Sequence, residues 1–203
     1  MTVGLLGMLY SACTNDVVDC NWPYIPTISH VIRQPFYDRI FCILVMFFTM
    51  AVFQIDVRAY YSRLDGIATP FCNTSMLYLG MISCITLTLD GYMDEKTYPI
   101  IHVINATLFF ISMGLYAWLL AAVMNNNLDK FPEEDYPEIA TLNKVKWVML
   151  ASLLLQLFSF LFADYVAHLA EWAAALLFIN FFSILSFTNR YYDTVRPVSV
   201  SID

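Results

Sequence analysis

Five long apolar stretches, separated by short charged segments, constrain the fold of this chain more than any other feature. A helix needs about 20 mostly apolar residues to cross a bilayer, within a range of about 17–25. Four of the stretches reach that length, and the first falls just short of it. The sequence therefore predicts an all-α membrane protein built as an antiparallel bundle of five transmembrane helices. In chain order the stretches are Ile40–Ile55, Phe71–Leu89, Val103–Met124, Trp147–Ala163 and Trp172–Thr188.

The composition agrees with a single membrane domain. Of the 203 residues, 60% are hydrophobic and 13% are charged, whereas ordinary globular chains are about 25% charged. Without the apolar stretches, no remaining segment is long enough to bury a core of its own, so we expect no second domain. The formal charge of −7 argues against nucleic acid as a partner, because nucleic acid requires a basic face. The expected environment is the lipid bilayer, with bound phospholipids and no other cofactor.

The polar residues divide the chain into three regions. Residues 1–37 form a head segment whose first apolar run, of about ten residues, is too short to span and predicts a short N-terminal helix or hairpin. Residues 38–190 form the bundle, and residues 191–203 form a polar tail. The expected spans are residues 40–57, 71–90, 99–124, 146–164 and 169–189.

The boundaries of these spans rest on a few local signals. Asp56 and Arg58 are expected to close the first span, because charged residues are costly inside a membrane. Pro99 can begin the third span at its first turn. Residues 164–171 are expected to be a short connection between the last two spans, and Trp172 is expected at the membrane interface.

The distribution of lysine and arginine predicts the orientation. If each stretch crosses once, seven of these residues lie on one side and three on the other. The positive-inside rule then places the richer side, which includes the C-terminus, in the cytoplasm or the mitochondrial matrix. The richer side carries Arg58, Arg63, Lys130, Lys144, Lys146, Arg190 and Arg196, and the poorer side carries Arg33, Arg39 and Lys96.

Histidines and carboxylates gather on the other, non-cytoplasmic side. Imidazole and carboxylate groups together could bind zinc or perform acid–base chemistry on a lipid headgroup. The simpler interpretation is that these groups cap helices or pair with one another near helix ends. Because the chain has no H-E-x-x-H, C-x-x-C, G-x-S-x-G or P-loop motif, we expect no enzyme activity, no catalytic residue and no metal site. The candidate polar cluster is Asp90, His102, Asp164, His168 and Glu171.

Two further groups of polar residues carry expectations. Cys13 and Cys20 share the head segment and could form a disulfide if that compartment is oxidising, although free thiols are an equally simple interpretation. Polar residues inside the spans are expected to form hydrogen bonds between helices. These residues are Gln54, Thr86, Thr88, Asn105, Gln156 and Asn180.

Three motifs resemble the Frag/DRAM/Sfk family of six-span membrane proteins. They are the segment Tyr24–Ser29, the helix His102–Ala106 with the aromatic residues that follow it, and Glu171-Trp172 at the start of the last span. In this chain the family's first span corresponds to the short N-terminal apolar run. The resemblance implies lipid or GPI-anchor handling, or membrane trafficking, with the head segment in the lumen and the C-terminus in the cytoplasm. It implies no catalytic residues.

Two functions compete on this basis. The absence of a catalytic motif and the short first helix favour a non-catalytic structural or accessory subunit of a larger membrane protein complex, for which the mitochondrial inner membrane is the expected location. The alternative is a lipid or GPI-anchor handling or trafficking factor in endomembranes such as the ER, the Golgi or the lysosome. A subunit should contact other membrane subunits, whereas a lipid-handling protein should keep a polar cavity open to the non-cytoplasmic leaflet.

Overall fold

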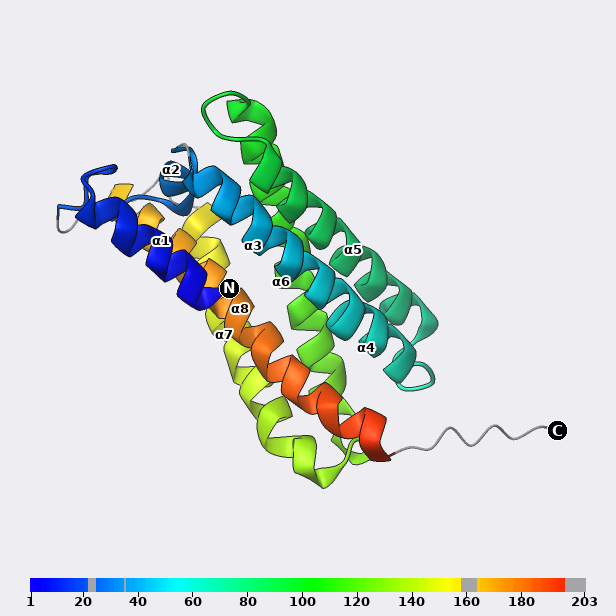
Figure 1. The fold of residues 1–203 in the computed structure, drawn as a ribbon. Helices are drawn as coiled ribbons and strands as arrows, with labels where there is room; N and C mark the ends of the chain where they lie inside the picture. The colour runs from blue at the N-terminus through cyan, green and yellow to red at the C-terminus, as the bar shows by residue number, and fades with distance from the viewer. Residues whose placement is uncertain (22–24, 35, 158–163, 196–203) are drawn as a thin grey trace.

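The computed structural model describes residues 1–21, 25–34, 36–157 and 164–195, and every regular element within them is a helix (Figure 1). The long helices run antiparallel and form one bundle, with the two short helices α1 and α2 at one end of it. The elements are α1 (Thr2–Thr14), α2 (Ile28–Ile32), α3 (Tyr37–Ala51), the π-helical η1 (Val52–Val57), α4 (Arg58–Arg63), α5 (Pro70–Tyr92), α6 (Pro99–Asn126), the 3-10 turns η2 (Leu128–Lys130) and η3 (Glu133–Asp135), α7 (Tyr136–Leu157) and α8 (Asp164–Val195).

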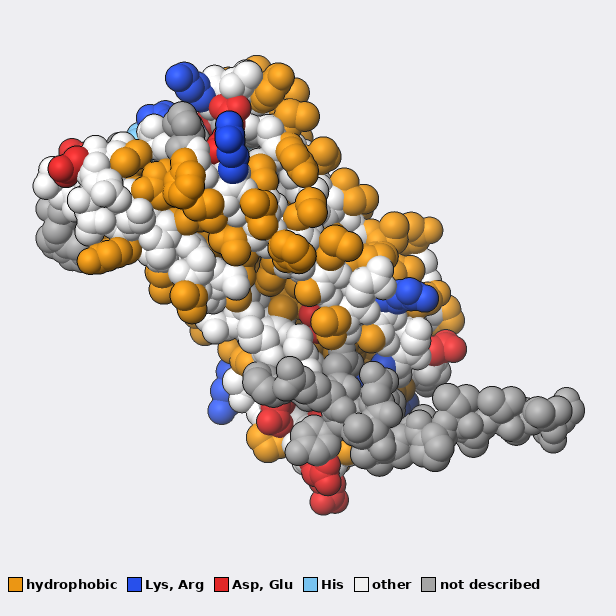
Figure 2. All heavy atoms as spheres, viewed as in Figure 1, with side chains coloured by type: hydrophobic (Ala, Val, Ile, Leu, Met, Phe, Trp, Pro, Cys, Tyr) orange, Lys and Arg blue, Asp and Glu red, His pale blue; other side chains and the backbone are white. Residues whose placement is uncertain are grey.

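Four helical stretches of the described residues are long and apolar enough to cross a membrane: Tyr37–Arg63, Pro70–Tyr92, Pro99–Asn126 and His168–Ser186. The fifth long helix, α7, packs against both α6 and α8, and the predicted span Trp147–Ala163 continues beyond its described end. On the face in view in Figure 2, hydrophobic side chains cover the middle of the bundle and charged side chains gather toward its ends. The predicted all-α membrane bundle with a short N-terminal helix is confirmed.

Local sequence determines where several helices begin. The Thr69 hydroxyl accepts a hydrogen bond from the Cys72 N–H at 3.3 Å and caps α5, whose first residue is Pro70. Pro99 lies at the first turn of α6, as predicted. Proline suits this position because its missing N–H would have no partner within the helix.

The first span is longer than predicted, because the charged residues expected to end it lie within a continuous helical stretch from Tyr37 to Arg63. Asp56 is 2% exposed and accepts a hydrogen bond from the Ser186 hydroxyl on α8 at 3.3 Å. Arg63 forms a buried ion pair with Asp135 at 2.7 Å. Partners inside the bundle thus allow Asp56 and Arg63 to be buried, and the helix continues past Asp56 and Arg58, which were expected to close the first span.

The last two helices also begin earlier than predicted. Helix α7 starts at Tyr136, directly after the buried Asp135, although the sequence predicted a start at residue 146. Helix α8 starts at Asp164, so residues 164–171 are helical and form no loop. Of the predicted tail, residues 191–195 belong to α8 and residues 196–203 lie outside the described residues.

Helix α1 packs against α2 and α3 and buries Leu5, Met8 and Ala12. With 13 residues it is only about 20 Å long, too short to cross the bilayer. A disulfide between Cys13 and Cys20, the pairing that the sequence suggested as one alternative, closes the turn that follows it.

Glycine at position 80 allows α5 to approach η1 closely. A Cβ atom at Gly80 would lie 2.7 Å from both methyl carbons of Val57. We expect Gly80→Ala to lower the melting temperature of the detergent-solubilised protein, because overpacking costs about 1–3 kcal/mol and exceeds the gain in helix propensity of about 1 kcal/mol. The added substitution Val57→Ala should restore part of the loss.

Gly7→Ala is the matched control, because a Cβ there would have no neighbour within 4 Å. Its melting temperature should equal or exceed that of the unchanged protein. Equal gains from Gly7→Ala and Gly80→Ala in a thermal-unfolding assay would contradict this account of the contact between α5 and η1.

Candidate functional site

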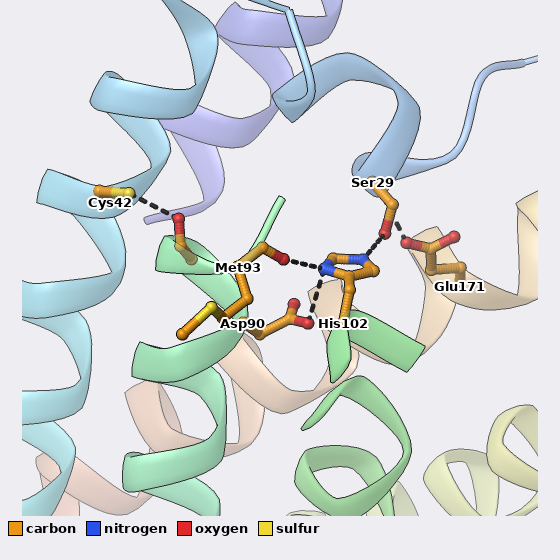
Figure 3. A network of polar contacts seen from close by, with 7 residues as sticks. Ser29, Cys42, Asp90, Met93, His102 and Glu171 are labelled. Carbon is orange, nitrogen blue, oxygen red and sulfur yellow. Dashed lines mark hydrogen bonds and ion pairs between the residues drawn. The ribbon is translucent and has the colours of Figure 1, made fainter. Parts of the chain in front are cut away.

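His102 lies at the centre of a polar network, which joins helices that are far apart in the sequence. Its side chain is 3% exposed, one turn into α6. The Nδ1 atom lies 2.9 Å from the carbonyl oxygen of Met93 and 3.0 Å from Oδ1 of Asp90, both at the end of α5 (Figure 3). The Nε2 atom lies 2.8 Å from the hydroxyl of Ser29 on α2.

These contacts define which ring nitrogen carries the proton. The Met93 carbonyl can only accept a hydrogen bond, so Nδ1 of His102 must be protonated. In the neutral ring, Nε2 then has a free lone pair and accepts the hydrogen bond that the Ser29 hydroxyl donates. The network therefore holds the imidazole with Nδ1 protonated and Nε2 directed at a serine hydroxyl.

Ser29 is positioned by the cap of α2 and by α8. The Thr27 hydroxyl accepts a hydrogen bond from the His30 N–H at 3.0 Å and begins the helix. The Ser29 N–H donates to Oε1 of Glu171 on α8 at 3.4 Å (Figure 3).

Two more side chains of α8 hold the segment that precedes α2. Nε1–H of Trp172 donates to the Pro26 carbonyl at 2.8 Å, and Nδ1 of His168 donates to the Ile25 carbonyl at 2.8 Å. Trp172 is 7% exposed, so it is buried within the bundle, and its place at the membrane interface stays a prediction. Its indole N–H donates to the Pro26 carbonyl, and its ring packs in the hydrophobic core.

Hydrogen bonds from Cys42 and Thr97 hold the connection between α5 and α6. The Cys42 thiol of α3 donates to the Gly91 carbonyl at 2.7 Å (Figure 3). The Thr97 N–H donates to Oδ1 of Asp94 at 2.8 Å, and hydrogen bonding from Thr97 lowers the pKa of that carboxyl. These contacts position the connection that carries Met93, the acceptor for His102.

A cavity of about 360 Å³ opens beside this network. At one end it is lined by polar residues that include Ser29, His102 and Glu171, and its apolar wall includes Phe110 of α6 and Leu153 of α7. The exposed residues Val103 and Thr107 also line it, so the cavity reaches the surface of the bundle.

A second cavity of about 360 Å³ continues between α6 and α7, and Leu153 lines both. We call the two cavities together the α6–α7 groove. At Gly114 on this groove, a Cβ atom would clash with Cδ1 of Leu153. Glycine here therefore leaves the space that the Leu153 side chain fills.

We call the end of the bundle with α2, the α5–α6 connection and the start of α8 the α2 end.

The polar end of the groove is acidic. Glu95 and Glu171 line it, and no lysine or arginine is among its described lining residues. Asp90 lies directly behind His102. Such a site attracts groups that donate hydrogen bonds or carry positive charge, and it disfavours anions.

The structure brings together three of the five predicted cluster residues, Asp90, His102 and Glu171, through Ser29, which the sequence analysis did not select. Ser29 ends the segment Tyr24–Ser29, so its place in that motif was the available signal. His168 contacts the backbone beside the network, and the side chain of Asp164 lies outside the described residues. Among the described residues, no group of three or more histidines, cysteines and carboxylates could hold a metal ion.

The pKa of His30 tests the electrostatics of the α2 end of the bundle. Burial, and then the positive charge of Arg33, lower the pKa of His30 from 6.5. Nη2 of Arg33 lies 3.2 Å from Nε2 of His30 and donates to it, which requires a neutral ring. Folding stability should therefore fall as the pH drops below about 6.5, because the unfolded chain then binds a proton that the folded chain resists.

NMR titration of the protein labelled at histidine should give a pKa for His30 below 6.5. Arg33→Gln should raise this pKa only in part, because burial remains as the larger cause. Arg39→Gln, at an exposed position, is the control and should leave it unchanged. An unchanged value in Arg33→Gln would contradict the assigned contact.

The profile of the Frag1/DRAM/Sfk1/Cwh43P N-terminal domain family matches residues 1–188. No curated protein and no solved structure matches the chain. The family match includes α1 and every residue of the polar network, and it ends within α8. It thus extends further toward the N-terminus than the motifs that carried the resemblance, which began at Tyr24. The chain is therefore a multi-pass membrane protein that belongs to the Frag1/DRAM/Sfk1/Cwh43P family.

Proposed function

We propose that this protein binds a membrane lipid at the α2 end and handles it there, in the manner of a lipid or GPI-anchor handling factor of endomembranes. The observation that carries the proposal is the cavity of about 360 Å³ with a polar end at Ser29, His102 and Glu171 and an apolar wall along α6 and α7. A bilayer lipid has the same division into a polar and an apolar part. The sequence analysis named such a cavity as the feature that distinguishes lipid handling from a subunit role.

The depth of the cavity supports a lipid ligand. Helix α6 has 28 residues and is about 42 Å long, whereas the hydrocarbon core is about 30 Å thick. His102 lies three residues after the first residue of α6, about 5 Å along the axis. The polar end of the cavity therefore lies near the boundary between headgroups and acyl chains.

The charge of the site indicates the class of headgroup. Glu95 and Glu171 can accept hydrogen bonds from hydroxyl or ammonium groups, and they would repel a headgroup with net negative charge. An acyl chain of the same lipid would lie in the α6–α7 groove beside Phe110 and Leu153. We therefore expect a neutral or zwitterionic lipid.

The distribution of lysine and arginine supports the choice of leaflet, because it predicts that the α2 end faces away from the cytoplasm. The accessory-subunit interpretation and the mitochondrial inner membrane stay predictions, since no observation on the single chain favours them. Exposed apolar residues such as Phe71 and Ile100 suit lipid tails as well as a protein neighbour.

Thr107→Trp tests the proposal by filling the cavity from an exposed position on its wall. We expect the purified protein in mild detergent to lose most of its co-purified lipid, measured by native mass spectrometry, because the indole would occupy the space for the acyl chain. Glu95→Gln combined with Glu171→Gln should change which headgroups are retained.

Leu108→Trp is the matched control, because Leu108 is a neighbouring residue that is 46% exposed and does not line the cavity. It should retain lipid as the unchanged protein does. Equal lipid content in Thr107→Trp and Leu108→Trp, with both proteins folded, would exclude the cavity as the lipid site.

A further inference from the structure

Ser29, His102 and Asp90 bring a hydroxyl, an imidazole and a carboxylate together. Nδ1–H of His102 donates to the Met93 carbonyl, and Oδ1 of Asp90 lies beside that nitrogen without a hydrogen-bond partner among the described residues. The Ser29 hydroxyl lies 2.8 Å from Nε2 of His102, and Nδ1 of the same ring lies 3.0 Å from Oδ1 of Asp90 (Figure 3). This is the order in which a nucleophile, a general base and an orienting carboxylate occur in serine-dependent acyl transfer. The three residues come from α2, α6 and α5, so no short sequence motif contains them.

We infer that Ser29 is a nucleophile, that His102 is its general base, and that the protein transfers the acyl group of an ester-linked membrane lipid through an acyl-serine intermediate. The inference rests on the proposed lipid site and assigns a reaction to it. Ser29 and His102 would be catalytic residues, and Asp90 would be a positioning residue because it acts through His102.

The state of the ring matches the role of a general base. The Met93 carbonyl keeps the proton on Nδ1, and Asp90 lies beside the same atom. In the neutral ring, Nε2 then presents its lone pair to the Ser29 hydroxyl. A ring in the other tautomer would donate to the serine and could not remove its proton.

The position of Ser29 gives it access to a lipid ester. Ser29 and His102 both line the cavity, and the wall of the cavity continues along Phe110 to Leu153 and into the α6–α7 groove. A lipid with its chain in the groove and its headgroup near Glu95 would have its ester group between them. Ser29 lines the same cavity as Glu95, Phe110 and Leu153.

The reaction balances with residues of the chain and one acceptor. The Ser29 oxygen attacks the ester carbonyl carbon while its proton moves to Nε2 of His102. The bond between that carbon and the ester oxygen breaks, and the proton on His102 passes to the departing oxygen, which leaves as the alcohol of a lysolipid. Water or a hydroxyl of a second lipid then attacks the acyl-serine, gives its proton to His102, and releases a fatty acid or a newly acylated lipid. The proton on His102 returns to Ser29.

The negative charge that develops on the carbonyl oxygen requires a donor. The N–H of Ser29 is a backbone donor on the same residue as the hydroxyl, and its hydrogen bond to Glu171, at 3.4 Å, is the longest contact of the network. A substrate oxygen can take over this weak hydrogen bond as the tetrahedral centre forms.

The experiment uses the full chain in nanodiscs of phosphatidylcholine and a long-chain alkyl fluorophosphonate, which reacts with activated serines. We expect the probe on Ser29, identified by peptide mass spectrometry, and no label in Ser29→Ala. His102→Asn should slow labelling by about 100-fold or more, since general bases contribute about 10²–10⁴-fold. Asp90→Asn should also slow labelling and shift its pH profile.

Ser83→Ala is the matched control, because it removes a buried hydrogen bond of 2.7 Å to Ser112 between α5 and α6, away from the network. Its labelling should equal that of the unchanged protein. If His102→Asn shows no cooperative thermal transition, the comparison rests on Asp90→Asn, which retains the shape of the side chain.

Co-purified lipid, measured by native mass spectrometry of the same variants in mild detergent, separates this inference from the proposed function. Retained lipid with no label on Ser29 would overturn the acyl transfer and leave lipid binding standing. Labelling that persists in a folded His102→Asn variant would also overturn it. A protein that retains no lipid would overturn both. With a fluorescent ester lipid, release of fatty acid would identify water as the acceptor, and a new acylated lipid would identify a hydroxyl.

Discussion

The burial of His102 is the constraint on which the α2 end of the bundle depends. An imidazole that is 3% exposed must have partners for both ring nitrogens, because an unpaired buried polar group costs about 1–3 kcal/mol. Those partners come from the end of α5 and from α2, and α2 is in turn held by α8. One side chain thus fixes the relative positions of four helices.

At the opposite end of the bundle, buried charged groups are also paired within the protein. Arg63 pairs with Asp135 at 2.7 Å and its guanidinium lies over the rings of Tyr60 and Phe131. The pocket beside Tyr60 leaves no room for a water molecule, whereas the His102 network lies beside a cavity that reaches the surface. The difference between a closed and an open polar site is what directs our functional proposal to the α2 end.

The sequence predicted the helical bundle because apolar length depends only on local composition, and it predicted the short α1 for the same reason. Its errors share a cause, since pairing across the fold overrides local polarity: Asp56 lies within a helix because Ser186 faces it. Of the polar residues expected to join helices, Thr88 does so, because its hydroxyl lies 3.2 Å from that of Thr49 on α3. The side chains that form hydrogen bonds within their own helices are those of Thr86, Asn180 and Gln54. The Nδ2 atom of Asn105 has no hydrogen-bond partner among the described residues, and the side chain of Gln156 lies outside them. The Tyr24–Ser29 motif contained Ser29, but its contact with His102 could not be predicted, because only the fold brings α2 to α6.

The most direct test of the account is a structure of the full chain in lipid nanodiscs, determined by electron cryomicroscopy with a bound antibody fragment. Our account predicts a lipid with its headgroup within hydrogen-bonding distance of Glu95 or Glu171 and an acyl chain between α6 and α7, beside Leu153. A map that resolves lipids elsewhere around the bundle, and shows protein side chains filling the α6–α7 groove, would contradict it.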